Sequence, residues 1–430
     1  MSRPEDQPTS RPGATSGDGR AVRPRDAAWV GAASAWSALT GLVIMVMAVG
    51  VLTPAQYTQF AVFWSLLFWI GGSMGGVQYE SLRATAAAGR TGTGARIFPV
   101  MMASSAGIAL VLALGLPWSG HLFHVDPVVS GLLVAGNLLL FGGEQAVIGL
   151  LNGQGRWRAG AWVSFLDVTL RFVPFLVLVL LRAAPLAYRV AAAAGPLALL
   201  VVLTVPRVRA LARVRGDDRA AVAVPATLYA VVSNFATATF LVGYPTLLGL
   251  VLAPAVLKQP AIAGLLFAMS MTRAPLMMPL TAFQGMLIAH FVRSGVRRSA
   301  ALRLVGVVAA AGTVLSLALG LVGPPLLRLL KPAYHLGGWT VTALALGATA
   351  IGVVAVTGNV ALAAKRHRWY MAGWAVAIVV AVAILLVPGS VQTRVVVSLV
   401  AGPLCGAVVH VLGLRERAAL GTVTGDDIRA

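Results

Sequence analysis

Four ionisable residues lie inside long apolar stretches of the chain, where a charge is costly. They are Glu144, Asp167, Arg171 and Arg273. At membrane depth each charge costs several kcal/mol unless the side chain faces a cavity or a partner of opposite charge. Residues of this kind therefore indicate a ligand site, an ion-coupling site or a structural ion pair.

Asp167 and Arg171 are four residues apart and so share one face of a predicted helix. This spacing permits two interpretations. In one, the two side chains neutralise each other as a structural pair. In the other, Arg171 binds an anionic substrate, while Asp167 and Glu144 form a proton relay. We predict Arg171 as a substrate ligand and Glu144 and Asp167 as ion-coupling residues.

Arg273 has no acidic residue within its own predicted helix. Because an arginine stays charged, it needs either a carboxylate from another helix or an anionic ligand. Pro275 and Pro279 follow it, and a proline bends a helix by removing a backbone hydrogen bond. Broken helices beside a cavity are typical of transporters. We therefore predict Arg273 as the main substrate-binding residue.

Three amide side chains are further candidates for contacts with sugar hydroxyls. Asn137, Asn234 and Gln284 all lie within predicted helices. The alternative for each amide is a hydrogen bond to a neighbouring helix. We include all three in the predicted substrate-binding set.

Membrane helices are the elements that must position these residues. Of the 430 residues, 58% are hydrophobic and 11% are charged, whereas soluble proteins are roughly half apolar and a quarter charged. A soluble globular protein is therefore nearly excluded. The net charge of +20 comes from basic residues in short loops, which indicates membrane topology and no nucleic-acid partner. The single Cys405 excludes an intrachain disulfide and a multi-cysteine zinc site.

Apolar windows near the ~20 residues that a bilayer requires recur along the whole chain. They predict an all-α polytopic membrane protein with about 12 transmembrane helices. No alternating strand pattern competes with this interpretation. The seventh predicted span ends at Tyr244 or continues as far as Leu252. The predicted spans are 28–52, 57–78, 97–117, 128–151, 161–181, 185–205, 222–244, 261–290, 302–321, 338–363, 369–387 and 395–414.

Two short motifs recur six predicted helices apart. Val51-Leu-Thr-Pro-Ala55 resembles Val251-Leu-Ala-Pro-Ala255, and Arg156-Trp-Arg-Ala-Gly-Ala-Trp162 resembles Arg368-Trp-Tyr-Met-Ala-Gly-Trp374. We interpret them as a parallel repeat of two six-helix halves, the alternative being chance similarity in a chain rich in Ala and Gly. The interface between the halves is then the expected substrate path.

The predicted organisation follows from these spans and from the distribution of Lys and Arg. It comprises a disordered cytoplasmic tail (1–27), an N-terminal six-helix bundle (28–205), a basic cytoplasmic linker (206–221), a C-terminal six-helix bundle (222–414) and a second cytoplasmic tail (415–430). In membrane proteins the cytoplasmic loops hold the excess of Lys and Arg. We therefore predict a protein of the inner (cytoplasmic) membrane with both termini in the cytoplasm. The basic loop residues on the other side are Arg182, Arg189, Lys258, Arg328, Lys331 and Arg394.

Catalytic and metal chemistry has little support in the sequence. The loop His121-Leu-Phe-His124-Val-Asp126 holds three potential metal ligands, but a metal site needs further ligands and supporting groups, so a hydrated loop is favoured. A Walker A motif is absent, which excludes P-loop ATP hydrolysis. The predicted outer loops are too short for a catalytic domain. We predict no enzyme activity, no catalytic residue, no metal site and no cofactor.

Three segments resemble a known transporter family. Val51-Leu-Thr-Pro-Ala-Gln-Tyr57, followed by an apolar helix and Gln78-Tyr-Glu-Ser-Leu-Arg83, resembles the first two helices of the polysaccharide-unit (Wzx-type) flippases. Leu150-Leu-Asn-Gly-Gln-Gly-Arg156 is similar to the loop after helix four in that family. The family belongs to the multidrug, oligosaccharidyl-lipid and polysaccharide exporter (MOP) superfamily. The chain departs from the family's turn at Thr53, where a Gly is usual. Helix one also lacks the acidic residue of many drug exporters in the superfamily, which argues against ion-coupled drug export.

The resemblance implies a function and a mechanism. Two helix bundles would alternate access and move a lipid-linked saccharide from the cytoplasmic to the outer leaflet, powered by an ion gradient. Our first hypothesis is therefore a non-enzymatic flippase or exporter for an anionic, lipid-linked saccharide intermediate of an envelope polysaccharide. The alternatives are an ion-coupled multidrug or small-molecule exporter of the same fold and an integral-membrane glycosyltransferase. Expected partners are the lipid-linked saccharide, membrane lipids, and the glycosyltransferases and polymerase of the same pathway.

Overall fold

The computed structural model describes residues 24–88, 92–273, 298–364 and 366–420. These residues are helical almost throughout, and the only β-type pairing among them is one isolated bridge between Arg96 and Arg215. A helix satisfies its backbone polar groups internally, which is what an apolar chain in lipid requires. The predicted all-α membrane class is confirmed.

The described residues of the first half contain eight α-helices, and two pairs of them follow one another directly. Helices α2 and α3 together form a span of 35 residues, and α7 and α8 form a pair bent by 45°. Their bounds are α1 (Pro24–Val51), α2 (Pro54–Ser73), α3 (Gly75–Ala88), α4 (Ile97–Leu114), α5 (Pro127–Gly153), α6 (Trp157–Leu180), α7 (Pro185–Ala193) and α8 (Ala198–Leu203), with the 3₁₀ turns η1 (Leu116–His121) and η2 (Gly195–Leu197).

The second half begins after two short helices in the linker. A single helical run, made of α10, the π-helical turn η4 and α11, spans 32 residues. The bounds are α9 (Pro206–Arg209), η3 (Ala210–Arg213), α10 (Ala220–Ala238), η4 (Thr239–Gly243), α11 (Tyr244–Val251), α12 (Pro254–Leu257), α14 (Arg298–Leu330), α15 (Gly338–Ala363), α16 (His367–Leu386) and α17 (Val391–Leu420). Residues 260–273 are also helical.

Ten helices in the described residues are long and apolar enough to cross a membrane, and the bent pair α7–α8 makes eleven. The predicted eighth span, 261–290, is described only as far as Arg273, so the rest of it, with Gln284, lies outside the described residues. Each of the other predicted spans has a matching helix. The seventh continues through Val251, which agrees with the longer of its two predicted ends.

Some predicted boundaries are wrong by a few residues. Helix α1 begins at Pro24, inside the predicted tail 1–27, because proline suits the first helical position and Asp26 lies in the first turn. Helix α10 begins at Ala220, inside the predicted linker 206–221, and α17 continues past 414 to Leu420. The predicted ends follow the apolar residues, whereas Ala, Leu, Arg and Glu extend a helix beyond them.

The linker is fixed to the first half by backbone hydrogen bonds. The amide of Gly94 donates to the carbonyl of Gly216 at 2.7 Å, the amide of Gly216 donates to Ala95 at 2.9 Å, and the amide of Ile97 donates to Val214 at 3.0 Å. A Cβ atom at Gly94 would lie 2.6 Å from the carbonyl oxygen of Asp217, so the close approach needs a glycine here. The linker is therefore part of the first half.

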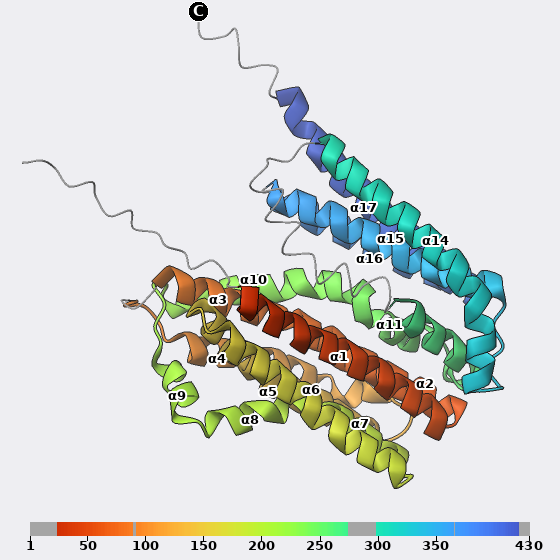
Figure 1. Ribbon diagram of the computed structural model, residues 1–430, viewed down its shortest axis with the longest axis horizontal. Coiled ribbons are helices and arrows are strands. Elements are labelled where there is room, and N and C mark those ends of the chain that lie inside the picture. The colour runs from red at the N-terminus through yellow and green to blue at the C-terminus, as the bar shows by residue number, and fades with distance from the viewer. Residues whose placement is uncertain (1–23, 89–91, 274–297, 365, 421–430) are drawn as a thin grey trace, which may run out of the picture.

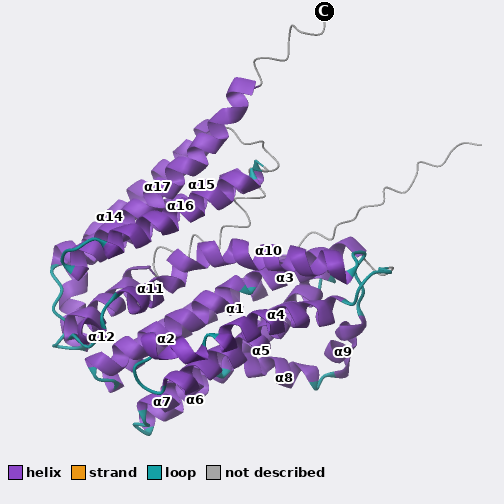
Figure 2. Cartoon of the chain, turned by 180° about the vertical axis from the view of Figure 1, so that it is seen from behind, coloured by secondary structure: helices purple, strands orange, loops and turns teal. Residues whose placement is uncertain are grey.

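The helices form two groups that diverge from one another. Helices α14–α17 form one group and α1–α9 the other, with α10 and α11 between them (Figures 1 and 2). The groups converge near α11 and diverge toward the end of the molecule that holds the start of α1 and the end of α17 (Figure 1). We call these two ends the closed end and the open end.

Candidate substrate cavity

The helical run through α10 and α11 is interrupted beside α2. Pro245 has no N–H to donate, so the carbonyl of Leu241 loses its usual helical partner. Residues Thr239–Gly243 take up a π-helical turn at this point. Turns of this kind inside α-helices are frequent at functional sites.

Side chains of α2 replace the backbone hydrogen bonds that the turn loses. The hydroxyl of Ser65 donates to the carbonyl of Val242 at 2.6 Å and accepts from the amide of Thr246 at 3.2 Å. The indole Nε1 of Trp69 donates to the hydroxyl of Thr239 at 3.0 Å. These bonds hold the turn against α2 and give the wall between them a defined shape.

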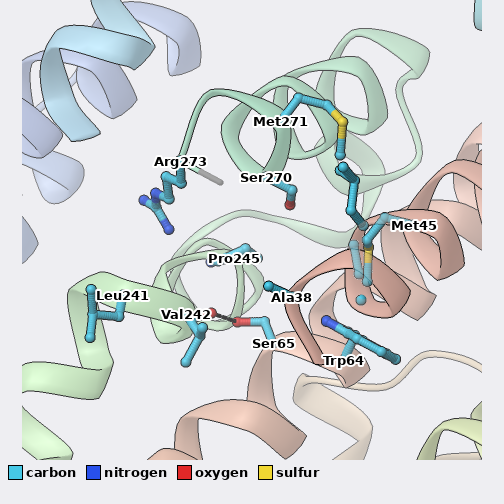
Figure 3. A pocket seen from close by; sticks show the side chains of 13 residues that line it. Ala38, Met45, Trp64, Ser65, Leu241, Val242, Pro245, Ser270, Met271 and Arg273 are labelled. Carbon is cyan, nitrogen blue, oxygen red and sulfur yellow. Dashed lines mark hydrogen bonds between the residues drawn. The ribbon is translucent and has the colours of Figure 1, made fainter. Parts of the chain in front are cut away.

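A cavity of about 360 Å³ lies on the other side of this wall. Four elements line it: α1, α2, the run from η4 into α11, and helix 260–273 (Figure 3). Most of the lining is apolar, including Met45, Trp64 and Met271, while Ser65, Ser270 and Arg273 add polar groups. A largely apolar pocket with few polar groups is the common form of a ligand site.

Arg273 is the charged residue of the cavity lining. Its side chain extends from helix 260–273, on the opposite side of the cavity from Trp64 (Figure 3). Arg273 is 7% exposed, and its Nη2 atom has no hydrogen-bond partner in the described part of the protein. Its guanidinium carbon lies 5.5 Å from the centroid of the Tyr244 ring. The ring gives a cation–π contact, but it does not neutralise the charge.

The spans of the second half contain no carboxylate side chain that could pair with Arg273. Between Asp218 and Glu416 the sequence contains no Asp and no Glu. Among the described residues, the ion pairs join Arg83 to Glu80 and Asp218, and Arg171 to Asp167, and none includes Arg273. A buried charge without a partner costs several kcal/mol, so Arg273 is set up for an anionic ligand.

The other three ionisable residues form a separate cluster in the first half. Nη2 of Arg171 lies 3.0 Å and 3.1 Å from the two carboxylate oxygens of Asp167. The two residues are 4% and 7% exposed. The structure thus contains the ion pair that the four-residue spacing permits. Arg171 does not line the cavity, so the structure does not bring it together with Arg273.

Glu144 lies next to this pair. It is 1% exposed, interacts electrostatically with Asp167 and Arg171, and its Oε2 atom has no hydrogen-bond partner in the described residues. Gly195, at the break between α7 and α8, packs directly on the ion pair. A Cβ atom there would collide with Oδ1 of Asp167 and Nη2 of Arg171. The break in the sixth span is therefore shaped around the pair.

The predicted amide ligands do not line the cavity. Asn137 is 7% exposed and donates from Nδ2 to the carbonyl of Ala193 at 2.9 Å, which is a bond between α5 and α7. Asn234 donates to the carbonyl of Ala230 in its own helix at 2.9 Å. Gln284 lies outside the described residues. The contacts of Asn137 and Asn234 match the interhelical and local bonding that polar residues make in membrane helices.

Several cavity residues were not singled out from the sequence. Ser270 precedes Arg273 by three residues and so shares its helix face, a signal that was present in the sequence. Trp64 lies in the middle of a span rather than at a span end, where membrane tryptophans gather. Ser65 and Met271 carry no such signal, because their place in the cavity depends on how α2 and helix 260–273 are packed.

The outer loop with two histidines forms no visible metal cluster. No group of three His, Cys, Asp or Glu side chains able to hold a metal occurs within the ranges that the structure describes. The backbone amide of His124 donates to Oε1 of Gln59 at 3.2 Å, and its Nδ1 lies 3.2 Å from the carbonyl of Gly120. The residue thus has local contacts of its own.

Two curated mycobacterial proteins are similar to the chain over almost its whole length. The uncharacterized protein Rv3630 of Mycobacterium tuberculosis is 32% identical over 415 residues, which cover 94% of this chain and 95% of that protein. The uncharacterized protein Rv1510 of the same species is 33% identical over 413 residues, again covering 94% and 95%. No family model matches the chain.

Solved structures with a similar fold are transporters. An inward-facing conformation of a multidrug resistance MATE family transporter of the MOP superfamily aligns with a TM-score of 0.68 and 13% identity, covering 90% of this chain and 96% of that one. An outward-facing conformation of a transporter of the same description aligns with a TM-score of 0.58 and 12% identity, covering 93% and 96%. The chain therefore has the fold of these transporters.

Proposed function

We propose that this chain, which belongs to the same family as Rv3630 and Rv1510 of Mycobacterium tuberculosis, is a non-enzymatic membrane exporter. Its cargo in this proposal is an anionic, lipid-linked saccharide intermediate of an envelope polysaccharide. Support for export comes from the transporter fold, shared over nine tenths of the chain. Support for the anionic cargo comes from the cavity.

The observation that carries the cargo proposal is the unpaired Arg273. Arg273 is one of the residues that line the cavity, its buried Nη2 atom has no hydrogen-bond partner, and no carboxylate among the described residues pairs with it. Arginine presents fixed donors that match phosphate oxygens, and charge-assisted hydrogen bonds are the strong ones. The phosphate of a lipid-linked saccharide would offset the cost of keeping the charge at membrane depth.

The shape of the molecule supports alternating access. The two helix groups diverge toward the open end (Figure 1), and the fold aligns better with the inward-facing transporter than with the outward-facing one. The basic loops predict that the open end faces the cytoplasm. We infer that this conformation is the one that receives cargo from the cytoplasmic leaflet.

The test uses purified protein in liposomes and a fluorescent polyprenyl-diphosphate sugar. Arg273→Ala is expected to abolish flipping while leaving insertion and folding intact, and Arg273→Lys to retain part of the activity, because lysine keeps the charge and loses the fork. Arg328→Ala is the matched control, since Arg328 is exposed and, among the described residues, hydrogen-bonds to Pro324 in its own helix. Normal flipping by a well-folded Arg273→Ala protein would refute the proposal.

The same liposomes separate the alternatives. The transporter fold is equally consistent with a multidrug or small-molecule exporter, which would show gradient-linked export of a dye and no flipping of the sugar lipid. A cationic dye would be repelled by Arg273. Formation of a glycosidic product would instead identify a glycosyltransferase.

We further propose that Glu144 and Asp167 couple transport to protons. The pair Asp167–Arg171 leaves Glu144 with an unpartnered carboxylate oxygen in a buried place. Uptake of a proton would remove its charge, which a buried carboxylate favours. Arg171 has its carboxylate partner already, so in this proposal it positions Asp167 and is not the main contact of the cargo.

The orientation is testable with single cysteines in a Cys405→Ser background. Arg213→Cys in the linker is expected to resist an impermeant thiol reagent in intact cells, whereas Ala333→Cys, after α14, is expected to react. Both positions are exposed in the structure. Labelling at position 213 alone would reverse the proposed topology and place the open end outside.

A further inference from the structure

A second cavity, of about 270 Å³, lies next to the first one. Helix 260–273, α14, α15 and a single residue of α1 line it. The lining is apolar except for Thr272, and the hydroxyl of Thr272 already donates to the carbonyl of Ala268 at 2.9 Å. This cavity, the apolar cavity, therefore offers no free polar group to a ligand.

The two cavities adjoin at shared residues. Leu42 of α1 and Met271 of helix 260–273 line both of them. Arg273 lies two residues beyond Met271, while Phe267 of the apolar cavity precedes Met271 by one helical turn. The combined space thus has a cationic part and a hydrocarbon part in sequence along one helix.

The lining of the apolar cavity is partly exposed on α14. Its lining residue Leu326 is 48% exposed. Near it on α14, Leu329 is 81% and Val322 is 61% exposed, which is the lipid-facing pattern of a membrane helix. A chain lying in the membrane can therefore enter the cavity from the side.

Helices α1 and α14 are held away from this opening by other neighbours. Trp36 of α1 packs against α6, with its ring 5.6 Å from the ring of Phe165. On α14, Gly312 faces α15 so closely that a Cβ atom would lie 2.4 Å from Thr349, and neither residue lines the apolar cavity. Each helix thus packs mainly on a neighbour other than the helix across the cavity.

We propose that the apolar cavity holds the hydrocarbon chain of the same cargo whose anionic headgroup lies at Arg273. This inference rests on the proposed function and adds to it a binding site for the chain. The apolar cavity lies nearer to the closed end than Arg273 does. Its lining includes Leu326, Leu327 and Leu330, which lie at the C-terminal end of α14, and α14 ends at the closed end. A lipid of the cytoplasmic leaflet has this order, with its headgroup toward the cytoplasm and its chain toward the bilayer centre.

The energetic basis is packing and not the hydrophobic effect. A hydrocarbon chain leaving lipid for an apolar cavity exchanges one apolar surrounding for another, so little is gained from water exclusion. What the cavity adds is a fixed shape, with dispersion contacts that a chain of matching form fills. The expected consequence is selectivity for the chain attached to a given headgroup.

The test compares two probes that carry the same sugar diphosphate, one on a long polyprenyl chain and one on a short, water-soluble prenyl chain. Leu319→Trp fills the apolar cavity from a half-buried position, and Leu317→Trp adds the same ring at the 51% exposed, non-lining face of α14. Binding to each variant in nanodiscs is measured by competition against a labelled long-chain probe.

The wild-type protein is expected to bind the long-chain probe at least tenfold more tightly than the short-chain probe. Leu319→Trp should remove this preference and leave the affinity for the short-chain probe unchanged, whereas Leu317→Trp should keep the preference. Arg273→Ala should weaken both probes. A photoreactive group at the end of the long chain should label the segment of α14 that contains Leu326 and Leu327, and excess unlabelled long-chain probe should suppress the labelling.

Two results would overturn the inference and leave the proposed function intact. One is equal binding of the two probes to wild-type protein while Arg273→Ala still weakens both. The other is labelling of α14 that ordinary phospholipid suppresses as well as the unlabelled probe, which would mean that bulk lipid fills the cavity. If Arg273→Ala weakens neither probe, the proposed function itself fails.

Discussion

The two halves of the molecule differ in whether a buried arginine has a carboxylate partner. In the first half, Arg171 and Asp167 form an ion pair at 3.0 Å, with Glu144 beside them. In the second half, Arg273 has no ion-pair partner among the described residues, and no acidic residue occurs in the sequence between Asp218 and Glu416. Arg171 in the first half thus has a carboxylate partner, whereas Arg273 in the second half has none among the described residues.

This difference separates a structural role from a ligand role. A buried charge that is paired neutralises its partner, so its removal lowers the free energy of unfolding. A buried charge without a partner lowers stability and is retained where a ligand or a mechanism needs it. The halves should therefore respond with opposite signs when their arginines are replaced by methionine.

The largest effect is expected for Arg171→Met. It leaves Asp167 buried and unpaired, which should lower the free energy of unfolding by about 3–5 kcal/mol. The measurement is thermal or denaturant unfolding in detergent. The double variant Arg171→Met, Asp167→Leu should restore most of the stability, because replacing both partners of a buried pair by apolar residues is often near neutral. An unchanged stability of the single variant would contradict the structural role of the pair.

Arg273→Met is expected to act in the other direction on stability. Removing an unpaired charge from membrane depth should raise the free energy of unfolding by roughly 1–3 kcal/mol, while flipping of the anionic lipid falls about 100-fold, or about 2.7 kcal/mol in the barrier. Unfolding and liposome flipping are measured on the same preparation. A loss of stability like that of Arg171→Met would show that a carboxylate pairs with Arg273 and would remove the basis of the ligand role.

The sequence was sufficient for the elements. Spans follow from apolar runs, because these depend on positions within one helix. The four-residue spacing permitted the Asp167–Arg171 pair but did not decide between the pair and a substrate ligand at Arg171. The lack of a carboxylate partner for Arg273 also had a sequence signal, because no Asp or Glu occurs between Asp218 and Glu416.

The lining of the cavity was not predictable in the same way. Asn137 and Arg171 lie within spans as Arg273 does, yet Asn137 bonds to Ala193 on another helix and neither residue lines the cavity. Which face of a helix meets the cavity depends on its rotation against neighbours far away in the sequence. The bonds from Ser65 to the turn at Val242, 177 residues apart, are of this long-range kind.

A smaller effect is expected when the cluster of the first half loses its titratable carboxyl. Glu144→Gln keeps the volume and fixes a neutral side chain, so transport should lose most of its response to an imposed proton gradient, because the side chain can no longer take up a proton. Glu80→Gln is the matched control, because Glu80 is buried but paired with Arg83 at 2.6 Å, away from the cluster. Equal gradient responses of the wild-type and Glu144→Gln proteins would exclude Glu144 from coupling.

The two ends of the molecule provide the last comparison, and the closed end holds a contact between the halves. Lys331, which follows α14, donates from Nζ to the carbonyls of Val49 at 2.9 Å and Leu52 at 2.7 Å. These carbonyls lie at the C-terminal end of α1, where a positive charge is favourable. Because Lys331 belongs to the second half and α1 to the first, the contact joins the halves at the closed end.

Lys331→Met should therefore shift the equilibrium away from this conformation. The side chain is only partly buried, so the expected loss is about 1 kcal/mol, or about fivefold in the population ratio. Spin labels at Arg213→Cys and Arg303→Cys, in a Cys405→Ser background, would report the shift as more of the short distances that closing the open end produces. Arg328→Met is the control, because Arg328 bonds within α14 and not to α1. If Lys331→Met and Arg328→Met give the same distance distribution as the parent, Lys331 does not hold the closed end, and the packing around it, including the rings of Tyr57 and Tyr334 at 6.3 Å, is sufficient.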